Sequence, residues 1–404
     1  MFDLPLLAAS HVYWAYGLFL LLVLGLLALD LGVFHRKAHE VKMKEAIGWS
    51  AVWLSLGVAF SAFVYLAYEH HWFDLGTASR MYNPASQTDP SAPLIVHGEV
   101  RGAAAAVQYL TGYVVEKSLA MDNIFVIALV FGFFAIPNKY QHRVLFWGII
   151  GALLMRGAMI FLGGELIVRY QWVLILFGGF LIVTAVKMAV IKHESDPSKN
   201  IAVRLMRRFY PVTNIYHGQK FFVHINRSEL EESKHLSTTD QKDIGGKAKA
   251  DRSKPRVWAM TPLFLALVMV EVTDLVFAVD SIPAIFAITP DPFIVFTSNI
   301  FAILGLRALY FCLAVAITKF RYLKPALILI LAYVGVKLLL LSLPPYLSVI
   351  GLPAHKSIKI DPFVSLGVIV ALLLAAVGAS ILRPEKDKDE PNLPHGPATP
   401  LPHG

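Results

Sequence analysis

The chain has 404 residues, of which 56% are hydrophobic and only 16% are charged. Soluble domains usually carry about a quarter charged residues, so this composition indicates a membrane protein. The net charge of +8 does not point to nucleic acid, because the basic residues lie in loops between apolar runs, where they set membrane orientation. The single cysteine, Cys312, excludes a disulfide framework or a thiolate metal site within one chain.

Nine apolar stretches are long enough to cross a bilayer, whose core of about 30 Å needs roughly 20 helical residues. The first is expected to be a retained helix and not a signal peptide, because no basic segment precedes it. The sequence therefore predicts an all-α fold, a polytopic membrane helix bundle with about nine transmembrane helices. The predicted spans are residues 12–34, 46–68, 107–135, 144–167, 171–191, 258–288, 293–317, 325–343 and 363–382.

Lysine and arginine counts in the short loops predict the orientation of these spans. The 69–106 and 289–292 loops are poor in basic residues and are expected outside, whereas four other segments are basic and expected in the cytoplasm. Nine spans then place the N-terminus outside and the C-terminus inside. The basic segments are residues 35–45, 136–143, 192–257 and 318–324.

Seven segments follow from this reading of the chain. The linker carries basic residues around Arg204 and a polar insertion at about 228–254, and we expect the insertion and the C-terminal tail to be disordered. The segments are a membrane hairpin (1–69), an outer loop (70–106), a first three-helix repeat (107–191), a basic cytoplasmic linker (192–257), a second three-helix repeat (258–343), an outer loop with the last transmembrane helix (344–383) and a cytoplasmic tail (384–404).

Charged residues recur in the same order in spans three to five and in spans six to eight. Charges inside spans are rare, so a match in three successive helices predicts an internal repeat. A unit of three helices crosses the membrane an odd number of times, so the two repeats would be inverted. Inverted repeats are typical of transporters, with the site near the midplane. The matched pairs are Glu116 with Asp274, Asp122 with Asp280, Arg156 with Arg307, and Lys187 with Lys337.

Acidic side chains gather in the middle of the third and sixth spans. A charge there costs at least about 2.5–3.5 kcal/mol, and Lys117 alone cannot neutralise five carboxylates, so either some are protonated or a cation shares the site. Their oxygens suit manganese, magnesium or calcium, and no histidine lies inside a predicted span core, which disfavours zinc and copper. The predicted metal site comprises Glu116, Asp122, Asn123, Glu271, Asp274, Asp280 and Ser281.

Helix geometry adds detail to this site. Residues seven positions apart share a helix face, so Glu116 aligns with Asn123, and Asp274 aligns with Ser281. Pro283 lacks a backbone N–H and is expected to kink the sixth span near the acids. Unwound backbone at a midplane ion site is known from transporters.

A structural role for the same charges stays open. Buried carboxylates can pair with Lys117, Arg156 or Arg307 and hold helices together without binding any ion. Glu165 is expected to anchor the outer edge of its span. Lys187 and Lys337 are expected to extend from span ends toward the headgroups.

At these residues the sequence resembles the TerC family of integral membrane proteins, and within it the Alx-like branch. The resemblance covers most of the spans, and its acidic motifs are specific. The outer loop 69–106 and the insertion at 228–254 depart from the family pattern. The matching stretches are DLGVFHRKAHEVKMKEA (30–46), LTGYVVEKSLAMDNIFV (110–126), GQKFFV (218–223), EVTDLVFAVDSIPAIFAIT (271–289) and TSNIFAILGLRALYF (297–311).

The resemblance implies a transporter and not an enzyme, one that exports a divalent cation, most directly manganese, from a bacterial inner membrane. It implies no bound cofactor beyond the transported ion, and its partners would be membrane lipid and that ion. The family name also records tellurium resistance. The alternative is a membrane scaffold or a subunit of a metal or tellurite stress-resistance complex. A homo-oligomer, or a cytoplasmic partner at the 192–257 linker, is left open.

Overall fold

The computed structural model describes residues 8–32, 43–87, 89, 92–134, 136–170, 172–190, 206, 210–227, 230–231, 256–316, 322–344 and 358–382. The predicted disordered insertion at 228–254, the basic stretch around Arg204 and the tail after residue 383 lie almost wholly outside these residues. The disorder and the basic surface expected for these segments therefore stay predictions.

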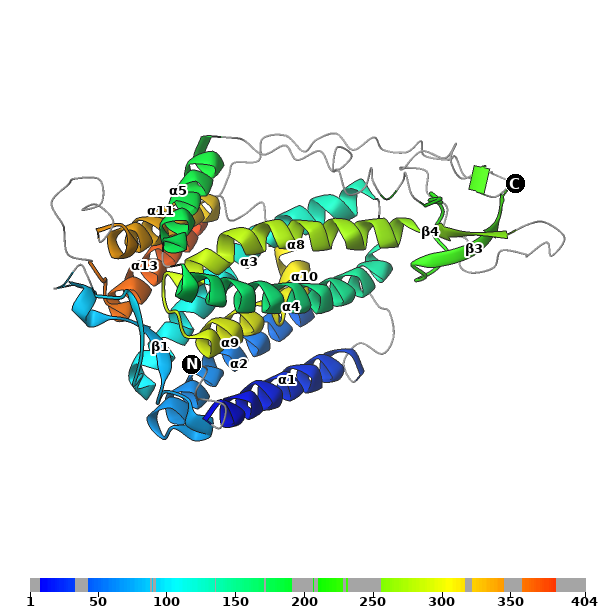
Figure 1. Cartoon of the computed structure of the whole chain (residues 1–404). Coiled ribbons are helices and arrows are strands. Elements are labelled where there is room, and N and C mark those ends of the chain that lie inside the picture. Colours follow the sequence, from blue (N-terminus) through cyan, green and yellow to red (C-terminus); the bar gives the residue numbers. More distant parts are fainter. Residues whose placement is uncertain are drawn as a thin grey trace, which may run out of the picture.

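Long helices packed side by side form one bundle (Figure 1). Among the described residues, eight segments are long and apolar enough to cross a membrane, so the chain is a multi-pass helical membrane protein. One of the eight, Pro292–Cys312, combines two consecutive helices. The helices are α1 (Ala8–Gly32), α2 (Met43–Glu69), α3 (Gly102–Phe133), α4 (Asn138–Arg169), α5 (Val173–Val190), α8 (Pro262–Phe286), α9 (Pro292–Ile303), α10 (Leu306–Ala316), α11 (Leu323–Ser342) and α13 (Pro362–Leu382).

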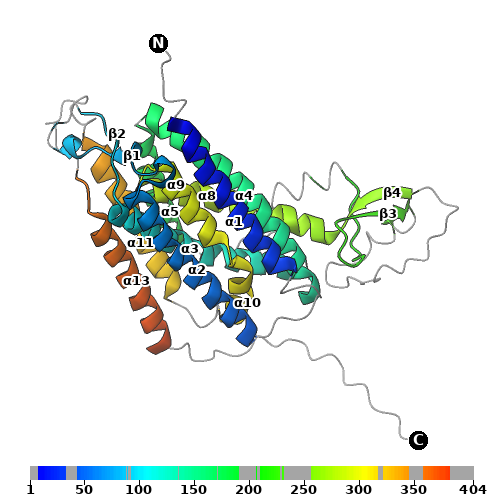
Figure 2. The same ribbon diagram turned by 90° about the horizontal axis from the view of Figure 1, so that it is seen from below.

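The third predicted span, residues 107–135, falls on α3, which is not among the eight apolar segments. This helix has 32 residues, enough to cross a bilayer at 1.5 Å per residue, but it carries Glu116, Lys117 and Asp122 close together. It lies inside the bundle, in contact with α2, α8, α9, α10 and α13 (Figure 2). Its burial among other helices explains why it tolerates charges that lipid would not.

Two short hairpins mark the two ends of the bundle (Figures 1 and 2). One pairs β1 (Ser79–Tyr82) with β2 (Ile95–Gly98), flanked by the short helices η1 (Trp72–Asp74) and η2 (Pro84–Gln87). The other pairs β3 (Phe222–Asn226) with β4 (Arg256–Met260). For these residues the sequence predicts only loop and linker, apart from residues 258–260 of β4, which it places in the sixth span. Strands of four or five residues are too short for a clear alternation of polar and apolar residues.

Helices α3 and α8 run in opposite directions. Helix α3 begins just after β2, and α8 begins just after β4 at the other end of the bundle. At the β1–β2 end, Tyr82 donates a hydrogen bond to the carbonyl of Phe286, the last residue of α8. At the β3–β4 end, Tyr216 donates to the carbonyl of Phe134, just after α3 (2.6 Å). Opposite directions are what inverted repeats require, while the inversion of the full three-helix sets stays a prediction.

A helix break occurs between α9 and α10 rather than at Pro283. Helix α8 continues through Pro283 to Phe286, whereas α9 and α10 are separated at Leu304 and Gly305. Gly305 has a φ of +77°, a left-handed conformation that other residues adopt at a cost. The repeat match of Arg156 with Arg307 aligns Gly305 with Leu154, inside the continuous helix α4. The glycine at position 305 and the leucine at the matching position 154 account for the break in one predicted repeat and the continuous helix in the other.

We expect Gly305→Ala to destabilise the protein. The left-handed conformation costs a non-glycine residue about 1–2 kcal/mol. An added Cβ would also lie 2.4 Å from the Cβ of Trp53 on α2. The melting temperature in detergent should therefore fall. The control is Gly179→Ala in α5, where an added Cβ meets nothing within 4 Å. Equal melting temperatures for the two variants would contradict this account of the break.

Cysteine labelling tests which end of the bundle lies outside. In a Cys312→Ser background, Thr77→Cys and His97→Cys should react with a membrane-impermeant maleimide in intact cells. Lys139→Cys and Lys220→Cys should react only after permeabilisation. All four positions are exposed in the structure, whereas Thr289 and Asp291 of the 289–292 loop are buried and unsuitable. Labelling of both sets in intact cells would contradict the predicted topology.

Candidate functional site

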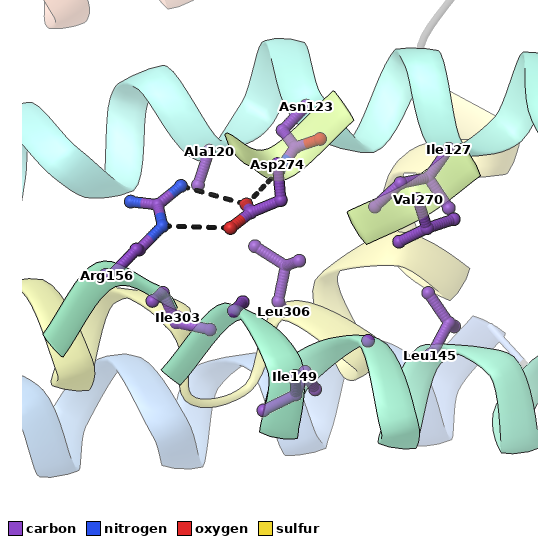
Figure 3. A pocket seen from close by; sticks show the side chains of 12 residues that line it. Ala120, Asn123, Ile127, Leu145, Ile149, Arg156, Val270, Asp274, Ile303 and Leu306 are labelled. Atoms are coloured by element: carbon purple, nitrogen blue, oxygen red, sulfur yellow. Dashed lines mark hydrogen bonds and ion pairs between the residues drawn. The ribbon is translucent and has the colours of Figure 1, made fainter. Parts of the chain in front are cut away.

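Three charged or polar side chains meet in the interior of the bundle, at one end of a small cavity (Figure 3). Arg156 of α4 donates to both carboxylate oxygens of Asp274 on α8, from Nη2 to Oδ1 at 2.9 Å and from Nε to Oδ2 at 3.1 Å. Asn123 of α3 donates to the same Oδ1 at 2.7 Å. The rest of the cavity is lined by apolar residues of α3, α4, α8, α9 and α10. Asp274 is therefore held on two sides, from two different helices.

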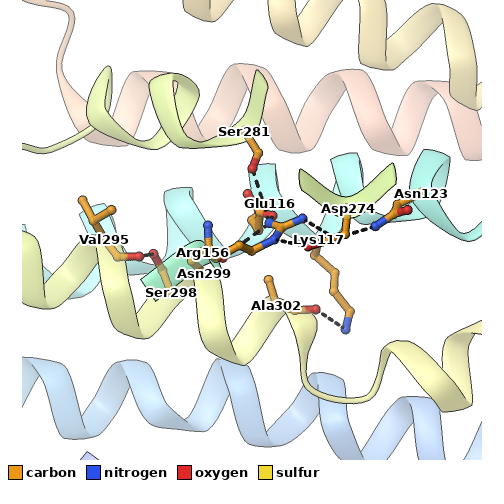
Figure 4. A network of polar contacts seen from close by, with 10 residues as sticks. All are labelled: Glu116, Lys117, Asn123, Arg156, Asp274, Ser281, Val295, Ser298, Asn299 and Ala302. Atoms are coloured by element: carbon orange, nitrogen blue, oxygen red, sulfur yellow. Dashed lines mark hydrogen bonds and ion pairs between the residues drawn. The ribbon is translucent and has the colours of Figure 1, made fainter. Parts of the chain in front are cut away.

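Arg156 also pairs with a second carboxylate, that of Glu116 on α3 (Figure 4). Its Nη1 further lies 3.3 Å from Oγ of Ser281 and 3.4 Å from Oδ1 of Asn299 on α9. Glu116, Arg156 and Asp274 are 0%, 2% and 5% exposed, so the three charges are buried. One guanidinium thus contacts two carboxylates and lies at the centre of the network.

Of the predicted ligands, Glu116, Asp274 and Ser281 each contact Arg156, and Asn123 contacts Asp274 beside it. Arg156 lies between the two carboxylates, and it is one of the three cations that the sequence offers as partners for buried acids. Asn299 was missed. The only feature that could have indicated Asn299 is its polarity within an apolar span. Its neighbours Thr297 and Ser298 are polar too, so this feature did not single it out.

Glu271 lies apart from the network, although it is on the same helix as Asp274 and one turn before it. Its carboxylate packs against Gly151 of α4, where even a Cβ would overlap it at 2.0 Å from Oε1. Its Oε2 atom is buried and has no hydrogen-bond partner. A glycine at position 151 is needed to leave room for this carboxylate.

Two of the predicted ligands, Asp122 and Asp280, lie on α3 and α8, but their side chains are outside the described residues. Among the side chains that are described, no group of three or more His, Cys, Asp or Glu lies close enough to hold a metal ion. The seven-residue ligand set therefore stays a prediction.

Lys117 turns away from the acids toward the helix break. Its Nζ donates to the carbonyls of Ala302 (3.0 Å) and Leu304 (3.1 Å), at the C-terminal end of α9. These carbonyls carry the negative end of the helix dipole, and a buried ammonium there satisfies and neutralises them. Lys117 therefore stabilises the broken helix and leaves Arg156 to neutralise the carboxylates.

The remaining matched charges differ between the repeats. Lys187 is exposed, as expected for a side chain that extends to the headgroups, but Lys337 is buried and donates to Oγ of Ser365 on α13 at 2.8 Å. The expectation for Lys337 was wrong because α13 covers that face of α11. Glu165 pairs with Arg80 of β1 at 2.6 Å, in agreement with an anchor at the end of its helix.

We expect Lys117→Met to destabilise the protein, because it leaves two buried carbonyls without a donor. A buried polar group left unpaired costs about 1–3 kcal/mol, which should lower the melting temperature measurably. The matched control is Lys187→Met, which removes an exposed lysine from α5. If the two variants melt at the same temperature, Lys117 does not stabilise the break.

The fold and the site together define a multi-pass helical membrane protein with a buried network of charges shared among α3, α4 and α8. Comparison with protein families matches residues 101–388 to the "Integral membrane protein TerC family". The chain belongs to this family, in agreement with the resemblance seen in its motifs.

Relatives match along most of the chain. A protein of Myxococcus xanthus named "Uncharacterized membrane protein STKORF319" is 41% identical over 380 residues, which cover 93% of this chain and 95% of the relative. A protein of Escherichia coli strain K12 named "Putative membrane-bound redox modulator Alx" is 39% identical over 329 residues, which cover 81% and 86%. No solved structure matches.

Proposed function

We propose that this protein exports a divalent metal cation, most directly manganese, across the cell membrane. The observation that carries the proposal is the convergence of Glu116 and Asp274, from antiparallel helices, on one buried position that a cation already fills. Buried carboxylates that face the interior of a helix bundle typically mark ion pathways in membrane proteins. A position between two oppositely directed helices also matches the sites of inverted-repeat transporters.

The donor atoms around this position support a hard cation. The carboxylate oxygens of Glu116 and Asp274 and the amide oxygen of Asn123 are the kinds of ligand that manganese, magnesium and calcium prefer. The unpaired Oδ1 of Asn123 is a further buried oxygen next to Asp274. Zinc and copper would favour imidazole or thiolate, and neither occurs among the residues that line the cavity.

Redox modulation appears in the name of the Escherichia coli relative. This chain has a single cysteine, Cys312, so a dithiol–disulfide exchange within one chain is excluded. Cation export requires only the carboxylates and amides that the network contains, and we favour it for that reason.

A membrane scaffold or stress-complex subunit is the second candidate, and the ion pairs of Arg156 are the observation that favours it. A guanidinium that holds two carboxylates joins three helices without any transported ion. The two candidates differ in what loss of one carboxylate does. A transporter should lose its flux, whereas a scaffold should lose its stability.

Cellular manganese content tests the proposal. Cells that produce the protein should accumulate less manganese than cells without it, and should tolerate manganese better than zinc, copper or tellurite. Asp274→Asn should reduce export at least about tenfold, because even indirect damage to metal ligation costs about 10–100-fold. Manganese should be measured by elemental analysis, with the amount of protein in the membrane determined in parallel.

Glu165→Gln is the matched control, since it removes a carboxylate that pairs with an arginine outside the network. It should leave export unchanged. Equal manganese content with and without the protein would refute the export proposal. A loss of Asp274→Asn from the membrane, together with equal manganese content in cells with and without the wild-type protein, would favour the scaffold.

A further inference from the structure

We infer that the Arg156 guanidinium is a resident cation that competes with the transported ion and restricts the site to divalent cations. This inference rests on the proposed function and assigns to Arg156 a role beyond holding helices together. Its basis is the geometry of the contacts. The guanidinium engages both oxygens of Asp274 and also contacts Glu116.

The same carboxylate oxygens cannot serve Arg156 and a metal ion together. Hard divalent cations bind oxygen at about 2.0–2.6 Å. With Nη2 at 2.9 Å from Oδ1 of Asp274 and Nε at 3.1 Å from Oδ2, a metal bound to Asp274 would lie directly against a positive guanidinium. The two cations repel strongly in a buried site, so Arg156 must leave when the ion enters.

The neighbouring atoms offer one nitrogen of the guanidinium other acceptors during this exchange. Nη1 already has two neutral acceptors, Oγ of Ser281 at 3.3 Å and Oδ1 of Asn299 at 3.4 Å. Both contacts are long, so they have room to shorten when the stronger contacts to the carboxylates are lost. Ser281, predicted as a metal ligand, is thereby assigned to Arg156 instead.

Charge decides which ions can displace the arginine. A divalent ion between Glu116 and Asp274 gains about twice the Coulomb energy of a single positive charge at the same place. A monovalent ion such as Na⁺ carries no more charge than the guanidinium that it would replace, and it lacks the guanidinium's paired hydrogen bonds. Divalent ions therefore displace Arg156 from the carboxylates, whereas monovalent ions do not.

The expected effect of Arg156→Gln is tighter and less selective binding. The purified variant should bind Mn²⁺ at least about tenfold more tightly than the wild type in isothermal titration calorimetry, because the competing charge is gone. Replacing N-methylglucamine chloride with NaCl at equal ionic strength should leave the wild-type dissociation constant unchanged and should raise that of Arg156→Gln. The variant should export less manganese, because release no longer has a competitor.

Thermal stability separates this role from a purely structural one. Arg156→Gln leaves two buried carboxylates without their cation, so its melting temperature should fall without metal and should rise more steeply with added Mn²⁺ than that of the wild type. Arg156→Lys keeps the charge but loses the bidentate geometry. Its melting temperature without metal should lie between those of the wild type and Arg156→Gln. It also carries the test if the glutamine variant does not fold. Lys337→Gln removes a buried cation elsewhere in the bundle and should leave metal affinity unchanged.

The outcomes distinguish the two proposals. If the wild type binds and exports manganese while both Arg156 variants bind it no more tightly, the competing role is wrong and the proposed function stands. If neither the wild type nor the variants bind manganese and cells show no export, the proposed function is wrong as well. Equal effects of Lys337→Gln and Arg156→Gln on affinity would also overturn the assignment to Arg156.

Discussion

The interior of this bundle depends on one guanidinium placed between two carboxylates. Arg156 of α4, Glu116 of α3 and Asp274 of α8 are all buried, and each would be costly alone in an apolar surrounding. Removing one partner from such a network typically costs about 3–5 kcal/mol, because the remaining charge is left unpaired. The relative placement of three central helices is therefore tied to these contacts, and any activity at the site must preserve or replace them.

A second buried cation, Lys117, follows Glu116 directly on α3, and the two side chains serve different neighbours. Successive residues of an α-helix point about 100° apart, so Glu116 reaches Arg156 while Lys117 reaches the carbonyls of Ala302 and Leu304. The break at Gly305 is tolerable inside the bundle because this ammonium satisfies the freed carbonyls. Helix α3 thus connects the acid network and the broken helix through two adjacent residues. These two roles explain why α3 carries buried charges and is not among the eight apolar segments.

The sequence predicted the helices and pointed to Glu116 and Asp274, because charges within apolar runs are conspicuous and costly. The sequence did not predict that Arg156 lies at the centre of the network. No spacing rule shows that a side chain on α4 contacts carboxylates on both α3 and α8. The sequence pointed to irregular backbone at Pro283 because proline is a strong local signal, whereas the break occurs at Gly305. That residue has a left-handed conformation and lies too close to Trp53 for a side chain. The short strands at the bundle ends were missed for lack of a periodic pattern.

The matched charges of the two predicted repeats have different surroundings, and this asymmetry bears on function. Arg156 lies in the continuous helix α4, whereas Arg307 lies in the first turn of α10, just after the break. Likewise Lys187 is exposed and Lys337 is buried against α13. A scaffold needs its ion pairs only to persist, so it gains nothing from weak contacts beside strong ones. The long contacts from Arg156 to Ser281 and Asn299, next to short ones to Asp274, instead give the guanidinium a second set of partners. A side chain with two sets of partners can exchange one for the other, which is what cation binding at these carboxylates requires.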